Sequence, residues 1–193
     1  MNTVGFTPEG RSGSNTDTTG FERAMREGLP MARTERVVQV GAGGAGSAVA
    51  DALLRLGARE LSIIDVDVER ASALAEELSV RHGAHVAGGT PTELPERLAA
   101  ADGVVQCTPI GMHQHPGLPF DPDLLRETHW VADIVYRPLD TALLAAARER
   151  GCRTLNGGRI AVGQAADTLR LVTGLEPDIE RMHQHCQRLI DAA

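Results

Sequence analysis

The residues whose types and spacing most clearly indicate a function are those at positions 41–46, which read Gly-Ala-Gly-Gly-Ala-Gly. They directly follow the apolar run 37–40 and lead into a stretch of helical character at 44–56. In such a strand, turn and helix, Gly41 permits a tight turn, Gly43 lets the backbone approach a pyrophosphate, and Gly46 lets the helix pack close to the strand. The amides that begin the helix would face the phosphates. We expect dinucleotide contacts at Gly41, Ala42, Gly43, Gly44 and Ala45.

An acidic residue closes the next apolar run, at the distance from the glycines where a carboxylate binds the adenosine ribose. The local sequence is Asp65-Val66-Asp67. Two carboxylates without an arginine would repel a 2′-phosphate, so NAD is favoured and NADP is the less favoured cofactor. A simpler alternative is that Asp65 and Asp67 only cap the helix that starts near Val68. Arg70 is a phosphate contact or, alternatively, a helix-surface residue.

The composition limits the classes of function. The chain has 193 residues, enough for one domain and part of a second. Its net charge of −7 argues against nucleic acid or an anionic membrane as the main partner. The three cysteines form no C-x-x-C pair, which indicates reduced thiols and a cytoplasmic location. No apolar run approaches the roughly 18 residues of a membrane span.

The elements that must position these residues alternate along the chain. Short apolar strands separated by amphipathic helices predict an α/β fold, a Rossmann-like doubly wound parallel sheet. Strands are expected at 37–41, 60–65, 84–87, 102–107, 130–135 and 152–155. Helices are expected at 17–28, 44–56, 68–82, 92–100, 121–126 and 139–150, with C-terminal helices at 160–173 and 177–191.

Further motifs belong to a resemblance that covers residues 2 to about 181. They are Asn15-Thr16-Asp17-x-x-Gly20-Phe21, Thr108-Pro109-Ile110-Gly111-Met112, Asp133-Ile134-Val135-Tyr136 and the run from Gly157 to Gln164-Ala165. In this order they resemble the shikimate/quinate dehydrogenase family. The resemblance implies an N-terminal substrate domain followed by a nicotinamide domain. It also implies hydride transfer between NAD(P) and shikimate, quinate or their 3-dehydro forms.

The resemblance implies a role for each matching residue. Asp17 corresponds to the catalytic aspartate that orients a lysine and binds a ring hydroxyl, although it could equally cap a helix. Asn2, Tyr136 and Gln164 correspond to substrate contacts. The expected nicotinamide-side contacts are Thr108, Pro109, Gly111, Met112, Ile134 and Gly157. The simpler alternatives are a plain turn for 108–112, packing for Tyr136 and a helix start for Gly157. NADP-using members resemble Asn-Arg-Thr at positions 65–67, where this chain has no arginine.

The chain also departs from the family pattern, because all 19 of its basic residues are arginine. The family's catalytic lysine is therefore expected to be missing. Because Asn2-Thr3-Val4 resembles the end of the family's substrate domain, we expect most of that domain to be missing too. We predict a remnant of that domain at 1–16, a linking helix and loop at 17–36, an NAD-binding domain at 37–158 and C-terminal helices at 159–193. Activity of this polypeptide alone should be low.

Several alternatives stay open. One is a non-catalytic NAD-binding fragment, or a half-enzyme that needs a partner chain. A homodimer and a complementing N-terminal half are both open as partners. Another Rossmann oxidoreductase, such as a glutamyl-tRNA reductase, is disfavoured by the Asp17 and Asp133 motifs. The pairs His113/His115 and His183/His185 lack an accompanying carboxylate cluster, so we expect no metal site.

Overall fold

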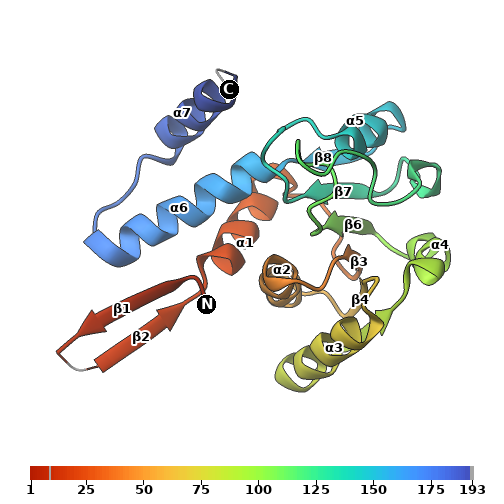
Figure 1. Cartoon of the computed structure of the whole chain (residues 1–193), viewed down its shortest axis with the longest axis horizontal. Coiled ribbons are helices and arrows are strands. Elements are labelled where there is room, and N and C mark those ends of the chain that lie inside the picture. Colours follow the sequence, from red (N-terminus) through yellow and green to blue (C-terminus); the bar gives the residue numbers. More distant parts are fainter. Residues whose placement is uncertain (9, 192–193) are drawn as a thin grey trace.

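A single parallel sheet organises the molecule (Figure 1). The computed structural model describes residues 1–8 and 10–191. The six strands lie in the order β5-β4-β3-β6-β7-β8, and all neighbouring pairs are parallel. Their bounds are β3 Arg36–Val40, β4 Glu60–Ile64, β5 His85–Gly89, β6 Gly103–Gln106, β7 Trp130–Asp133 and β8 Arg153–Leu155. This is the Rossmann strand order: from β3 the chain first adds β4 and β5 on one side and then β6, β7 and β8 on the other, and such sheets bind ligands at this switch point between β3 and β6. The expected fold class and all six strands are confirmed.

Helices cover both faces of the sheet, because its strands are apolar on both sides. Val37 and Ile63 face one apolar cluster, which includes residues of α1, α2, α3 and α6. Val38 and Ile64 face a second cluster with residues of α4 and α5. The bounds are α1 Thr16–Gly28, α2 Gly44–Arg55, α3 Val68–His82, α4 Leu94–Ala99, α5 Ala142–Glu149, α6 Gly157–Thr173 and α7 Ile179–Asp191.

Three local features differ from the sequence-based expectation. Residues 1–16, to which no strand was assigned, contain an antiparallel hairpin of β1 (Thr3–Thr7) and β2 (Gly10–Ser14), which projects from the body in Figure 1. The prediction of a helix at 121–126 is wrong, because only a short 3-10 turn, Pro122–Leu124, forms there. The segment at 92–100 begins with a 3-10 turn, Pro91–Glu93, before α4.

Helices α1 and α6 cross at glycines. A Cβ atom on Gly20 would come within 2.6 Å of the Gln164 backbone nitrogen, and one on Gly163 within 3.0 Å of the Gly20 carbonyl oxygen. The backbones therefore approach more closely than any larger residue would allow. This close crossing fixes the position of Asp17, near the start of α1, relative to Gln164 on α6.

Candidate functional site

A small cavity brings together residues that lie far apart in the sequence. Its volume is about 150 Å³. Its lining consists of Asp17, Ala45, Val49, Ile134, Tyr136, Gly157, Ile160, Ala161 and Gln164. Six of these are predicted site residues, and they come from α1, α2, α6 and the segment after β7. The lining is mostly apolar with a few polar groups, which is typical of a cofactor or small-molecule site.

The helix α1 presents Asp17 in its first turn. Asn15 is the N-cap, and its side chain accepts a hydrogen bond from the Asp17 amide at 3.2 Å. The capping role considered for Asp17 itself therefore belongs to Asn15. This leaves the half-buried Asp17 carboxyl available to the cavity.

The glycine turn leaves amide groups open at the start of α2. Gly43 is the N-cap, and no side chain caps this helix end. A Cβ atom at Gly43 or Gly44 would meet nothing within 4 Å. Unsatisfied amides and free space at a helix N-terminus suit a phosphate group. Gly41 has a φ of +107°, and a Cβ there would lie 2.8 Å from the Cys107 carbonyl group, so both the turn and the close approach require glycine.

The carboxylate of Asp65 is buried and holds three donors. Oδ2 accepts the Ala42 amide at 2.7 Å, and Oδ1 accepts the Asp67 amide at 2.9 Å and the Arg70 guanidinium at 2.7 Å. Burial raises the pKa of Asp65, but the hydrogen bonds from Asp67, Arg70 and Ala42 outweigh it and lower the pKa overall. Asp65 is thus a negative charge that orders the glycine turn. Its contact with a ribose stays a prediction.

Asp67 and Arg70 next to it are bonded to one another and to Asp65. Asp67 caps α3 by accepting the Arg70 amide at 3.1 Å. The Arg70 guanidinium pairs with Asp65 and lies 3.6 Å from the Asp67 carboxylate. Val66 lies between the two acids and is 87% exposed. Arg70 is therefore already engaged by two carboxylates, and its expected role as a phosphate contact stays untested.

The loop 108–112 lies at the carboxyl end of β6 and is organised by Gln106. The Gln106 side chain accepts the Thr108 amide at 2.6 Å and donates to the carbonyls of Thr108 and Ile110 at 2.9 and 2.7 Å. Gly111 has a φ of +103°, which the turn requires. Met112 then pairs with His115 in an isolated bridge.

The segment 134–136 is held by a fully buried carboxyl group. Asp133 Oδ1 accepts the Val135 amide at 3.0 Å, and Oδ2 accepts the Thr141 hydroxyl at 2.8 Å. Burial raises the pKa of Asp133 to about 6 in spite of these bonds. A Cβ atom on Gly157 would lie 2.4 Å from the carbonyl oxygens of Ile134 and Val135, so α6 begins directly on this segment.

The other predicted site residues do not line the cavity: they lie in the glycine turn before Ala45, at the carboxyl end of β4, in the loop 108–112 and at Asn2. The Asn2 side chain bonds to Thr16, with Oδ1 accepting the Thr16 amide at 3.0 Å. The four histidines considered as metal ligands also lie elsewhere, and no group of three or more His, Cys, Asp or Glu in the described ranges could hold a metal ion.

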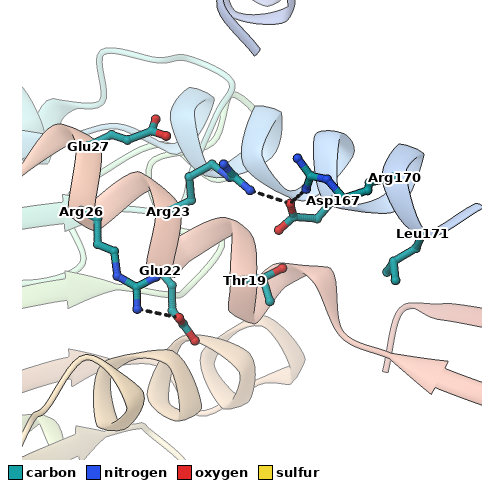
Figure 2. Close-up of a pocket in the computed structure, with 8 residues that line it drawn as sticks. All are labelled: Thr19, Glu22, Arg23, Arg26, Glu27, Asp167, Arg170 and Leu171. Atoms are coloured by element: carbon teal, nitrogen blue, oxygen red, sulfur yellow. Dashed lines mark hydrogen bonds and ion pairs between the residues drawn. The ribbon is translucent and has the colours of Figure 1, made fainter. Parts of the chain in front are cut away.

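A larger depression of about 510 Å³ lies on the outer side of α1 and α6 (Figure 2). Figure 2 shows Arg23 and Arg170 directed at Asp167, at 2.9 and 2.8 Å, while Arg26 pairs with Glu22. Each arginine is thus paired with a carboxylate, which makes the surface a poor anion site. Of these ion pairs, the one between Arg23 and Asp167 joins α1 to α6.

Comparisons with known proteins agree with this architecture. The sequence profile of the family described as shikimate / quinate 5-dehydrogenase matches residues 24–113. The chain is 56% identical over 181 residues to a shikimate dehydrogenase (NADP(+)) of Pseudarthrobacter chlorophenolicus, covering 93% of this chain and 62% of that protein. It is 52% identical over 184 residues to a quinate/shikimate dehydrogenase (NAD(+)) of Corynebacterium efficiens, covering 94% and 65%. The solved quinate dehydrogenase from Corynebacterium glutamicum in complex with NAD superposes with a TM-score of 0.89 at 50% identity, covering 94% and 65%.

The chain belongs to the shikimate/quinate dehydrogenase family. It spans less than two thirds of the length of these relatives. No helix within the described ranges combines the length and apolar character needed to cross a membrane.

Some residues around this cavity were not expected from the sequence. Val49 and Ala161 line the cavity but carry no chemical signal. Gln39 and Gln106 are fully buried and bond to the glycine turn and to the loop 108–110, respectively. A polar residue inside an otherwise apolar strand, shortly before a functional turn, was the signal that could have found them.

Proposed function

We propose that this chain binds NAD and forms the nicotinamide-binding part of a shikimate/quinate dehydrogenase, with shikimate, quinate or a 3-dehydro form as its small-molecule substrate. The observation that carries the proposal is the convergence of Asp17, Tyr136 and Gln164 on one cavity, next to Ala45 of the glycine turn. In this arrangement Asp17, Tyr136 and Gln164 would face the substrate, and the glycine turn and Ile134 would face the cofactor.

The chain's own residues fit this cofactor. The uncapped N-terminus of α2 and the free space above Gly43 and Gly44 would hold the pyrophosphate. Bound NAD supplies a hydride acceptor at its nicotinamide ring. Ile134 and Ile160 would exclude water beside that ring. Asp17 would accept a hydrogen bond from a ring hydroxyl of the substrate and orient the group that takes up its proton.

The preference for NAD rests on the carboxyl end of β4. The exposed Val66 offers no charge to a 2′-phosphate. Asp67, whose side chain is 47% exposed, would repel one, and Arg70 is engaged by Asp65. We infer that a 2′-phosphate would make binding of the cofactor weaker here, because the repulsion from Asp67 outweighs any attraction.

The residues 37–158 would form the NAD-binding unit and 159–193 the C-terminal helices, with 1–16 belonging to the substrate side and 17–36 linking them. The 193 residues contain no lysine, so the family's lysine would have to come from outside them. Apolar side chains on the hairpin and at the end of α6 are exposed, namely Val4, Phe6, Leu171, Val172 and Leu175. This apolar surface would pack against the polypeptide that completes the substrate site, and a homodimer is the alternative.

The first experiment is isothermal titration of the purified 193-residue chain with NAD and with NADP. We expect binding of NAD that is at least tenfold tighter than that of NADP. A folded sample that binds neither nucleotide would refute the proposal.

The second experiment measures oxidation of shikimate and quinate by the same chain. We expect turnover roughly 10²–10⁴-fold below that of a full-length relative, the usual contribution of general acid–base help. Substitution Asp17→Asn should abolish the residual rate while leaving NAD binding unchanged. Turnover equal to that of a full-length relative would show that the lysine is not needed.

A further inference from the structure

The central strand β3 carries a buried polar residue directly below the glycine turn. Gln39 is 0% exposed and is flanked in register by Ile63 of β4 and Val105 of β6. An amide in such surroundings is unfavourable unless its groups are hydrogen-bonded. Its Nε2 group donates two hydrogen bonds, to the carbonyl oxygens of Gly41 at 2.8 Å and Gly46 at 2.9 Å. One side chain therefore joins the first and last glycines of the turn.

The two ends of a single peptide group are held from two strands. A trans peptide directs its C=O and N–H groups to opposite sides of one plane. In the peptide between Gly41 and Ala42, the oxygen accepts from Gln39 on β3, and the N–H donates to Asp65 after β4 at 2.7 Å. The plane of this peptide is thus fixed at both ends, which a glycine at position 41 would not achieve by itself.

The fixed peptide sets the direction of the groups that follow. Gly43 and Gly44 are exposed, and no side chain caps α2. These residues have no side-chain contacts that would orient them, so the chain entering from Ala42 determines where their amides point. We propose that Gln39 is a positioning residue for the cofactor: together with Asp65 it locks the Gly41–Ala42 peptide and so aims the amides of the turn at the pyrophosphate. This inference rests on the proposed binding of NAD.

The bonding of Gln39 argues against a role in stability alone. Its Oε1 atom is buried and has no hydrogen-bond partner among the described residues. A buried acceptor without a partner is unfavourable, and an apolar residue of similar size would avoid this loss. The glutamine therefore fits the needs of the turn better than those of the core.

The test replaces Gln39 by methionine, which keeps the volume and removes both donors. We expect Gln39→Met to keep its melting temperature within about 4 °C of the wild type. NAD and ADP should bind roughly tenfold more weakly, and the Ala42 amide should exchange with solvent at least tenfold faster. The matched control is Gln106→Met on the neighbouring strand, which is equally buried but bonds to the loop 108–110. In this control, ADP affinity and Ala42 exchange should stay within twofold of the wild type.

The outcomes separate this inference from the proposed function. Wild-type protein that binds neither NAD nor ADP would overturn the proposed function. The exchange rate of the Ala42 amide would still test whether Gln39 fixes the Gly41–Ala42 peptide. Wild-type affinity and exchange in a folded Gln39→Met variant would overturn the inference alone. Should that variant not fold, Gln39→Asn, whose amide is too short to reach both carbonyls, takes its place with the same expectations. Failure of both variants to fold would also overturn the inference, because Gln39 would then serve the whole fold.

Discussion

The buried carboxyl of Asp133 should make the stability of the protein depend on pH. It is 0% exposed and accepts hydrogen bonds from the Val135 amide and the Thr141 hydroxyl. Substitution Asp133→Asn keeps its shape and removes its charge. The asparagine oxygen can accept the Val135 amide, and its NH₂ group can donate to the Thr141 oxygen, so both contacts survive.

The magnitude follows from the two pKa values of this group. The pKa is 3.8 in the absence of structure and about 6 in the folded protein, because burial disfavours the charged form. As pH rises from 4 to 6, the unfolded chain binds fewer protons than the native one, so stability falls. Above pH 6 the loss is complete and amounts to about 3 kcal/mol for a shift of this size. The asparagine variant does not lose this stability, because asparagine does not ionise.

Urea unfolding of wild type and Asp133→Asn between pH 4 and 7.5 measures the effect. The two proteins should be about equally stable near pH 4. At pH 7.5 the variant should be more stable by up to about 3 kcal/mol, or about 6–12 °C in melting temperature. Substitution of the exposed Asp121 by asparagine is the control and should keep the wild-type pH dependence. A stability difference between wild type and Asp133→Asn that is constant across this pH range would refute the reasoning.

Three further substitutions test the site and its supports. Gly157→Ala should lower the free energy of unfolding by about 1–3 kcal/mol in urea titrations, because its Cβ would overlap the Ile134 carbonyl oxygen; an unchanged value would contradict the packing. Gly43→Ala should change stability by less than about 1 kcal/mol, since its φ is −75° and nothing lies within 4 Å, yet calorimetry should show NAD binding weakened more than tenfold. Asp51→Ala should destabilise by about 1–3 kcal/mol in thermal unfolding, because the buried Asp51 carboxylate is shared by bases of α2 and α3. The substitution would remove the carboxylate from its partners Arg55, Arg81 and His82. An unchanged melting temperature would mean that these pairs contribute little to stability.

The elements of the sheet were predictable because their signals are local. Apolar runs such as 37–40 and 60–64 are strands by periodicity, and the glycines at 41–46 mark a turn whose geometry depends on neighbouring residues. The hairpin at 3–14 was not predicted, because few of its residues are apolar and its pairing is decided across the turn. The expected helix at 121–126 failed because Asp121 caps only a single turn that begins at Pro122.

The sequence by itself determined the Rossmann-like sheet, the family and the types of residue that could bind a cofactor. It also named Asp17, Tyr136 and Gln164, but only as matches to motifs. Their meeting in one cavity depends on the glycine crossing of α1 and α6, which no local pattern encodes. Likewise, only the tertiary structure shows Gln39 and Asp65 holding one peptide from two strands. Secondary structure follows from neighbours in the chain, whereas a site is made of contacts between residues that are distant in the chain.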